Sequence, residues 1–445
     1  MKLARRLTYS LGSLAHTLSY QAFTNRVQFF YIDALGLSAG LVSVVWFLFG
    51  LWNAVNDPLM GQLSDRTRSR WGRRIPYILA GAVPLGLAFF LMWTPPLGNA
   101  VLTAVYFGAI LFIFDTFSTL LLTAYHALFP EITSDTRDRA GLAAWRESMS
   151  VVGLILAFVL APMLSQRLGY PVMGAVVGVL TAGAYMLAML GLKEDPRRLG
   201  ETTLGFLESI RITLSNGPFR WFLGAAMVRE FNFVILSATV PFWAKYVLNL
   251  TTPAKLLGLT LAPALQESLL LAVPFLLAVP GLQLWRVITP RLGARRAWIA
   301  ANLAWLPGLT LIFLARDFTT ALLGVALIAP GFAGYLMLFI VLLSEITDYD
   351  ARRTGQYREG AFIGITFMFM RLAFSAQALL FLFVLNPSGY VPGAAVQPEG
   401  AVAAIRLLIG GAPFVACLIS AACLNFVRIP AGAGRPAAPE LAPAD

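Results

Sequence analysis

The chain has 445 residues, of which 58% are hydrophobic and only 12% are charged, and its mean hydropathy is +0.74. A soluble domain carries about 25% charged residues, so this composition excludes a soluble globular protein and makes the bilayer the solvent for most of the chain. The net charge is +11, but the arginines form short clusters between apolar runs. Such clusters are typical of cytoplasmic loops rather than of a nucleic-acid-binding surface.

Apolar runs long enough to cross a membrane occur along the whole chain. A span of roughly 30 Å of hydrocarbon needs about 20 residues, and twelve such runs are expected. They lie at about 8–32, 40–64, 76–95, 100–129, 140–167, 170–192, 218–247, 256–285, 297–315, 320–346, 360–385 and 402–427. Most of the 33 lysines and arginines fall on the side of the N-terminus, which predicts a multi-pass cell-membrane protein with both termini cytoplasmic.

The charged segment 193–217 divides the chain into an N-terminal half, 1–192, and a C-terminal half, 218–430, each with six spans. The loops after spans two and eight, "GQLSDRTRSRWGRR" and "WRVITPRLGARR", form a weak internal repeat. Parallel six-helix repeats are the architecture of major facilitator transporters. We therefore expect an all-α membrane protein of this fold, followed by a Pro/Ala-rich, disordered tail at 431–445.

The second span carries polar groups on one face. Asn53, Asn56 and Asp57 are spaced i, i+3 and i+4, so they share one side of a helix. Pro58 frees a backbone carbonyl one turn earlier. Oxygen ligands of this kind suit Na⁺ or a protonatable carboxylate. The spacing predicts a cation- or proton-coupling site at Asp57, with structural hydrogen bonding between helices as the alternative.

Several arginines lie inside the apolar runs, where charge is costly and indicates function. Arg371 lies more than ten residues inside span eleven and is predicted to face a central cavity. Arg26 and Arg146 lie nearer to helix ends, where an ordinary ion pair competes with a substrate role, and Asp115 is the partner expected for one of them.

Two further pairs of polar residues interrupt the spans of the C-terminal half. Arg229 and Glu230 are adjacent and point in different directions on a helix, so we expect them to serve separate partners. Gln266 and Glu267 interrupt span eight, and the sequence assigns them no role.

Charges at the inner ends of the spans predict a latch that closes one face of the protein. An acid at one helix end can pair with an arginine of a neighbouring helix. Such an ion pair can form in one conformation and break in the other. The candidates are Asp65, Arg66, Arg73 and Arg74 in the first half, and Asp348 in the second. The alternative is that these charges only fix the membrane orientation.

Four segments resemble the glycoside–pentoside–hexuronide:cation symporter family, the branch of the major facilitator superfamily that includes melibiose permease. They are "YIDALGLSAGLV", "WNAVNDPLMGQLSDRTRSRWGRRIPYILAG", "YHALFPEITSDTRDRAGLAAWR" and "SEITDYDARRTGQYREGAFIGITFMFMRLA". The resemblance spans nearly the whole chain. It implies a cation site on helices two and four and a sugar site between the halves.

Residues carried over from the family match only in part. Asp57 and Arg146 occupy the positions of the family's second helix-two aspartate and its helix-five arginine. Asn53 replaces the first helix-two aspartate, Leu122 lies where the helix-four aspartate is expected, and Thr17 lies at the helix-one sugar position. Arg371 replaces the helix-eleven lysine. The expected substrate-binding residues are Arg371, Arg146, Thr17, Arg26 and Trp52.

These observations predict a secondary active transporter that couples H⁺ or Na⁺ to a sugar, a glycoside or a similar small solute by alternating access. The alternative is a lysophospholipid or amphipathic-anion transporter in which Arg371 holds the headgroup. An ATP-driven pump is not expected, because none of the four lysines belongs to a phosphate-binding loop. An enzyme is not expected either, because no His-Glu-x-x-His motif or cysteine cluster offers a metal site. We expect no cofactor, no metal beyond a possible Na⁺ at Asp57, no nucleic-acid partner, and a monomer in the lipid bilayer.

Overall fold

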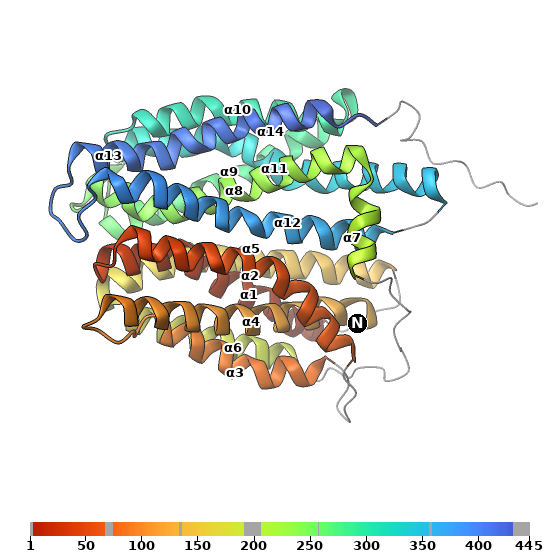
Figure 1. Ribbon diagram of the computed structural model, residues 1–445, viewed down its shortest axis with the longest axis horizontal. Helices are drawn as coiled ribbons and strands as arrows, with labels where there is room; N and C mark the ends of the chain where they lie inside the picture. The colour runs from red at the N-terminus through yellow and green to blue at the C-terminus, as the bar shows by residue number, and fades with distance from the viewer. Residues whose placement is uncertain are drawn as a thin grey trace, which may run out of the picture.

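The computed structural model describes residues 3–66, 74–132, 136–190, 206–256, 258–355 and 358–429. These residues form a bundle of long helices in two halves, one above the other in Figure 1. The N-terminal half consists of α1 (Leu3–Phe29), the π-helical turn η1 (Phe30–Ala34), α2 (Ala39–Arg66), α3 (Ile75–Leu91), α4 (Ala100–Ile132), α5 (Thr136–Leu168) and α6 (Tyr170–Ala188).

The short helix α7 (Phe206–Leu214) leads into the C-terminal half. That half consists of α8 (Gly217–Tyr246), β1 (Ala254–Leu256), β2 (Leu259–Leu261), α9 (Pro263–Leu292), α10 (Ala294–Leu314), α11 (Phe318–Thr354), α12 (Glu359–Leu380), η2 (Phe381–Leu385), η3 (Asn386–Ser388), α13 (Glu399–Arg406), η4 (Leu407–Gly411) and α14 (Ala412–Phe426). The expected tail, 431–445, and most of the expected linker lie outside the described residues.

The helices confirm the predicted fold class. Ten helices of the described chain are long and apolar enough to cross a membrane. The third predicted span is α3, which is apolar but has 17 residues. The first predicted span is α1, which is more polar than its neighbours. With these two, each of the twelve predicted runs corresponds to one helix or to one run of consecutive helical turns.

One predicted boundary is wrong. The run at 256–285 was expected to be helical throughout, but β1 and β2 pair as an antiparallel hairpin before α9 begins at Pro263. Gly258, in the turn, has a φ of +82°, a conformation that glycine adopts without steric cost. Pro263 then begins the helix, since its missing N–H is not needed at the first position.

Small residues let helices within each half approach closely. At the α3–α6 contact, a Cβ built on Gly86 would lie 2.5 Å from the carbonyl oxygen of Gly178, and a Cβ on Gly178 would lie 2.5 Å from that of Gly86. Backbone therefore meets backbone at this crossing. Close approach through small residues is a principal source of helix association in lipid.

Gly86→Leu is expected to lower the thermal stability of the purified protein, because the added side chain must push α3 and α6 apart. Overpacking of this kind costs roughly 1–3 kcal/mol. Gly183→Leu on α6 is the matched control, since a Cβ there meets nothing within 4 Å. Thermal unfolding in detergent is the measurement, and equal melting temperatures for the two variants would contradict the prediction.

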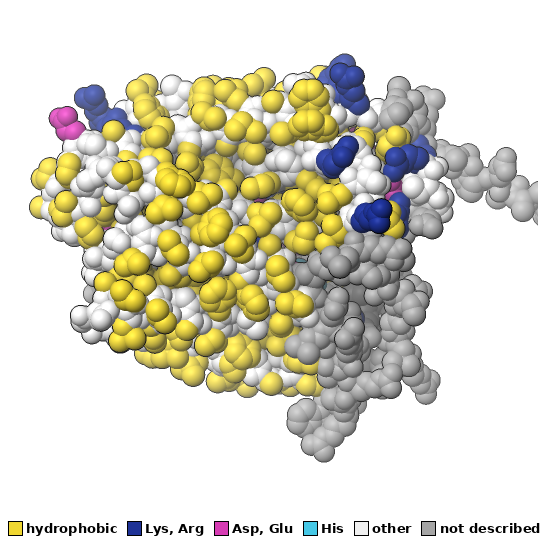
Figure 2. Space-filling model, in the orientation of Figure 1, with side chains coloured by type: hydrophobic (Ala, Val, Ile, Leu, Met, Phe, Trp, Pro, Cys, Tyr) yellow, Lys and Arg dark blue, Asp and Glu magenta, His cyan; other side chains and the backbone are white. Residues whose placement is uncertain are grey.

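The outward faces of the helices are apolar. Large exposed hydrophobic side chains include Val83, Val105, Val179, Val279 and Leu323. Figure 2 shows hydrophobic side chains over the middle of the visible face, with the visible lysines and arginines toward its two ends. This pattern is that of a protein surrounded by hydrocarbon at its middle and by water at its ends.

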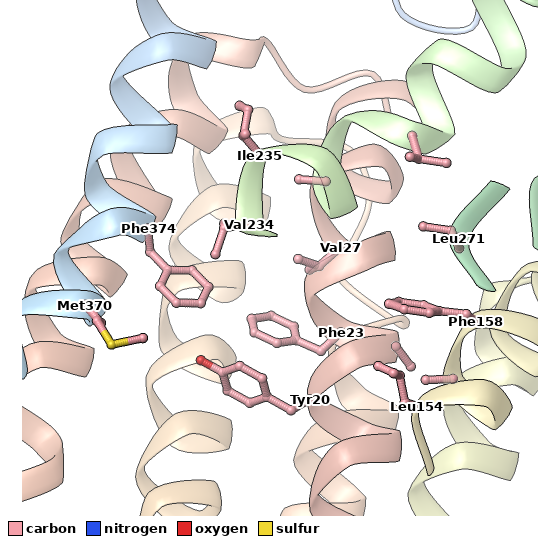
Figure 3. Close-up of a cluster of buried hydrophobic side chains, with 14 of the residues drawn as sticks. Tyr20, Phe23, Val27, Leu154, Phe158, Val234, Ile235, Leu271, Met370 and Phe374 are labelled. Carbon is pink, nitrogen blue, oxygen red and sulfur yellow. The ribbon is translucent and has the colours of Figure 1, made fainter. Parts of the chain in front are cut away.

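The two halves share an apolar interface, at which α2 packs on α12, α1 on α8 and α5 on α9. Figure 3 shows Phe23 and Tyr20 of α1 beside Phe374 of α12, with the Tyr20 hydroxyl directed toward α12. The ring centroids of Phe49 and Phe374 lie 5.6 Å apart, edge to face. This interface positions the polar side chains of α1, α2 and α12 that are described next.

Candidate functional site

Asp57 lies at the contact between the two halves. The helical spacing of α2 places Asn53 and Asn56 on the same side, and both are fully buried. One oxygen of Asp57, Oδ1, accepts a hydrogen bond of 3.2 Å from the hydroxyl of Thr119 on α4. The other, Oδ2, lies 3.4 Å from Nε of Arg371 on α12. A single carboxylate thus connects α4 of its own half to α12 of the other.

Asp115 supplies a second carboxylate from α4. The Asn56 amide donates to Oδ2 of Asp115 at 2.9 Å and to its backbone oxygen at 3.2 Å. Asp115 therefore does not pair with an arginine of span one or span five, and that prediction was wrong. Helix four has no carboxylate at Leu122, but it carries this one two helical turns earlier.

Tyr20 on α1 completes this cluster, and sequence reasoning missed it. Its hydroxyl accepts from Nη1 of Arg371 at 3.0 Å and from the Asn53 amide at 3.1 Å. The guanidinium of Arg371 also lies 5.5 Å from the centroid of the Tyr20 ring. The signal available in the sequence was weak, since a tyrosine in an apolar helix is most often a packing residue.

The cluster offers oxygen atoms to a cation. The amide oxygens of Asn53 and Asn56 are buried and have no hydrogen-bond partner among the described residues. The carboxylates of Asp57 and Asp115 lie on the same two helices, together with the Thr119 hydroxyl. Carboxylate, amide and hydroxyl oxygens are the ligands that hard cations prefer, and either carboxylate can alternatively take a proton.

A cavity of about 290 Å³ lies between the halves. Thr17, Gln21 and Ser150 line it from the N-terminal half, and the Thr17 and Ser150 hydroxyls are 2.8 Å apart. From the C-terminal half it is lined by Arg229 and Glu230 of α8. The remaining wall is apolar and aromatic: Val151, Leu154, Phe233, Phe275, Trp305, Phe332, Tyr335 and Leu336.

Arg229 and Glu230 contact one another, contrary to the expectation that they serve separate partners. Nη1 of Arg229 lies 3.5 Å from Oε2 of Glu230. Nε of Arg229 donates to the backbone oxygen of Tyr335 at 3.1 Å. Both side chains reach the cavity wall. Adjacent residues start in different directions on a helix, but these two side chains are long enough to meet.

Of the five residues expected to bind substrate, Thr17 alone belongs to the described lining of this cavity. Arg371, expected to face a central cavity, contacts Asp57 and Tyr20 instead. Arg146, Trp52 and Arg26 also lie away from the lining. The guanidinium of Arg146 lies over the rings of Tyr125 and Phe129, 5.0 and 4.8 Å from their centroids. Trp52 packs edge to face on Phe112 of α4, with ring centroids 5.7 Å apart. Arg146 and Trp52 thus pack against aromatic side chains, and neither belongs to the described cavity wall.

Arg26, another of these residues, forms an ion pair between the halves. Its Nη2 lies 2.7 Å from Oε1 of Glu267 on α9, and both side chains are almost fully buried. Gln166 of α5 donates to the other carboxylate oxygen at 3.0 Å. This geometry fits the ion-pair reading of Arg26 and gives Glu267 a partner that the sequence could not assign.

Arg26→Met is expected to lower thermal stability by about 3 kcal/mol, since removing one partner of a buried ion pair leaves the other charged and unpaired. The double variant Arg26→Met/Glu267→Met is expected to recover most of this loss, because two apolar side chains replace two buried charges. Thermal unfolding of both variants is the measurement. A double variant as unstable as the sum of the two single variants would contradict the expectation.

A second connection between the halves lies at the end of the bundle opposite the N-terminus, on the left in Figure 1. We call it the Asp33 cluster. Asp33 of η1 lies 2.6 Å from Nζ of Lys245 and accepts hydrogen bonds from the hydroxyls of Tyr246 and Tyr390 and from the amide of Gly393. The sequence did not indicate it, because Asp33 follows the predicted end of span one.

The partners of Asp33 change its acidity. Burial acts to raise the pKa of the carboxyl, but the hydrogen bonds from Lys245, Tyr246, Tyr390 and the Gly393 amide outweigh burial and hold the pKa below its usual range. The ionised carboxylate is therefore the form that joins the halves at this end.

The predicted latch of the first half falls largely on residues that are not described. The side chains of Asp65 and Arg66 and the whole of Arg73 lie outside the described residues. Arg74 is described: it is buried and directly precedes α3.

In the second half, the latch candidate Asp348 has no ion pair among the described residues, whereas the nearby Asp350 forms two. Asp348 is exposed. Asp350 is buried and pairs with Arg358 at 2.6 Å and with Arg353 at 3.3 Å, and it accepts from the Asn216 amide at 3.0 Å. On α11, residues two apart lie on different faces, and Asp350 lies on the face that contacts Asn216, directly before α8. Within the part of the chain that the structure describes, none of the partners of Asp350 belongs to the N-terminal half.

Comparisons with known proteins relate the chain to transporters. A family model described as MFS/sugar transport protein matches residues 8–431. The chain is 25% identical over 432 residues to a putative glycoside/cation symporter of Escherichia coli K12, covering 92% of this chain and 88% of the relative. It is 20% identical over 470 residues to sodium-dependent lysophosphatidylcholine symporter 1-A of Danio rerio, covering 96% and 85%.

A solved structure supports the fold. A bacterial homologue of the human lysosomal transporter Spinster, in an inward-facing and unoccupied conformation, is similar with a TM-score of 0.70 and 14% sequence identity. The match covers 96% of this chain and 97% of the other. At this identity the likeness shows the fold alone.

Proposed function

Because the chain belongs to the MFS/sugar transport protein family, we propose that it couples H⁺ or Na⁺ to the movement of a sugar, a glycoside or a similar small solute. The family match and the glycoside/cation symporter among its relatives confirm the resemblance seen in the sequence. The observation that carries the proposal is the contact of Asp57 with Arg371, which joins the two halves next to amide oxygens that have no hydrogen-bond partner among the described residues.

Coupling follows from the charge on Asp57. While it is ionised, Asp57 attracts Arg371 across the interface. A proton or a cation on the carboxylate reduces this attraction and allows the contact between α2 and α12 to separate. Asn53, Asn56 and Asp115 would supply the further oxygens for a cation. Substrate and cation are coupled if both favour the same arrangement of the halves.

The orientation of the chain gives the Asp33 cluster a role in this cycle. With both termini in the cytoplasm, the Asp33 cluster lies at the outer face and holds the halves together there. Alternating access requires this connection to break when the cavity opens outward. The charges around Asp65, Arg66, Arg73 and Arg74 then act as the inner latch of the opposite state.

One observation favours the lysophospholipid alternative. A second, apolar pocket shares Phe233, Phe275, Trp305 and Phe332 with the central cavity, so a polar headgroup and an apolar tail could lie side by side. Its volume is about 60 Å³, room for roughly four to six water-sized spheres. This is too small for a long acyl chain, and the small-solute reading is the better supported one.

Uptake into proteoliposomes tests the proposal. Na⁺ and H⁺ gradients are imposed separately, and a panel of labelled sugars and glycosides is compared with a labelled lysophospholipid. Accumulation of a sugar or glycoside under one gradient is the expected result. Movement of the lysophospholipid with none of the sugars would favour the alternative on the same fold.

A further inference from the structure

We propose that Arg229 and Glu230 act together as the hydrogen-bonding pair for an uncharged, polyhydroxylated substrate. The inference rests on the proposed function. It adds which residues bind the substrate and that the substrate is uncharged. Both side chains come from α8, both line the central cavity, and each is 19% exposed. No role in binding was expected of either residue from the sequence.

The geometry of Arg229 leaves part of its guanidinium available. Nε is fixed by the backbone oxygen of Tyr335 at 3.1 Å, and the guanidinium carbon lies 4.8 Å from the ring centroid of Phe339. The contact from Nη1 to Glu230 is long, at 3.5 Å. A guanidinium has five N–H donors in a fixed plane, so the head is held in place while donors remain for a ligand.

Glu230 offers the complementary acceptor. Among the described residues its hydrogen-bond partner is Arg229 alone, at the limit of hydrogen-bond distance. A carboxylate can accept about four hydrogen bonds. Two neighbouring hydroxyls of a sugar can therefore accept from Arg229 and donate to Glu230, and each of these bonds is charge-assisted.

The rest of the cavity suits the same class of ligand. On the opposite wall, the amide oxygen of Gln21 is buried and has no hydrogen-bond partner among the described residues, and it lies on the same wall as the Thr17 hydroxyl. The aromatic side chains Phe233 and Trp305 supply an apolar surface for the C–H groups of a sugar ring. A mainly apolar wall with a few converging polar groups is typical of a small-molecule site.

The charge balance favours an uncharged ligand. Arg229 and Glu230 are the charged residues of the described cavity lining, and their charges cancel. An anionic sugar would gain from Arg229 but would meet the carboxylate of Glu230 at the same place. A zwitterion is the rival ligand, because it could also use both charges.

The experiment compares Glu230→Gln and Arg229→Gln with wild type, using a neutral methyl glycoside, a hexuronate and a zwitterionic amino acid as labelled substrates. Both variants are expected to raise the half-saturation concentration of the glycoside by roughly 10- to 100-fold, since each removes hydrogen bonds to a charged group. Glu230→Gln is expected to improve uptake of the hexuronate. Glu399→Gln and Arg316→Gln, both exposed, are the matched controls, and thermal unfolding verifies that the variants fold.

The two levels of the proposal fail in different ways. Unchanged glycoside uptake in both folded cavity variants would overturn the role of this pair while leaving the transport function intact. A wild-type preference for the hexuronate or the amino acid would overturn the uncharged substrate. If wild type binds and moves no sugar at all, the proposed function fails together with the inference.

Discussion

Asp57→Asn is expected to abolish gradient-driven accumulation of substrate. The amide keeps the size of the side chain and can still contact Thr119, but it cannot take a proton or carry the charge that attracts Arg371. Substrate should then equilibrate across the membrane without accumulating, a loss of at least about tenfold in the accumulation ratio. Proteoliposomes loaded with substrate should still exchange it for labelled substrate, because exchange needs binding but no net coupling.

The neighbouring carboxylate makes this experiment specific. Asp115→Asn removes a charge from the same cluster but leaves the contact between Asp57 and Arg371 in place. It is expected to weaken cation affinity more than it weakens coupling, whereas Glu399→Gln, at an exposed position, should behave as wild type. Full accumulation by Asp57→Asn together with complete loss in Asp115→Asn would transfer the coupling role to α4.

The helices and the polar face of α2 were predictable because both depend on local periodicity. Apolar length predicts the spans, and the spacing of Asn53, Asn56 and Asp57 places them together whatever surrounds α2. Arg371 could be predicted to have a partner, since its charge cannot be removed. Which partner it has depends on how α2 and α12 are rotated about their axes, and no local pattern determines that rotation.

The contacts between the halves were therefore missed as pairs, although Asp57, Arg371, Arg26 and Glu267 were noticed singly. Arg26 and Glu267 are more than two hundred residues apart in the sequence, and only the packing of α1, α5 and α9 brings them together. Asp115 was assigned an arginine because opposite charges pair in lipid. In the structure an amide satisfies it, which shows that hydrogen bonding can satisfy a carboxylate within the bundle.

Opening the Asp33 cluster is expected to shift the protein toward an outward-open state. In Asp33→Asn the ion pair with Lys245 is lost, and an amide oxygen accepts more weakly from Tyr246 and Tyr390. Hydrogen bonds to a charged group contribute roughly 1.5–3 kcal/mol each. A loss of stabilisation of this size changes the ratio of the closed to the outward-open state by about a hundredfold. This effect is larger than any single exposed charge could have.

Labelling of a buried cysteine measures this shift. Ser237 of α8 is buried two helical turns before Lys245, and its hydroxyl has no hydrogen-bond partner among the described residues, so Ser237→Cys should be tolerated. A membrane-impermeant thiol reagent added outside should label this cysteine faster in the Asp33→Asn background. Glu399→Gln, at the same end of the bundle, should leave the rate unchanged, and the chain with only Cys417 and Cys423 gives the background. Equal labelling with and without the Asp33→Asn substitution would mean that the cluster does not hold the outer face closed.

A lower external pH should shift the wild-type protein toward the outward-open state, in the same direction as Asp33→Asn. The pKa of Asp33 is lowered by partners that it keeps only while the halves are joined at this end. The cluster therefore stabilises the closed state at pH values above the usual carboxyl range, and this stabilisation is lost as the pH falls toward the lowered pKa. Labelling of Ser237→Cys should rise on acidification of the outside, and Asp33→Asn should remove that part of the dependence. Because Asp57 lies at a different level of the interface, coupling and outer closure can then be perturbed one at a time.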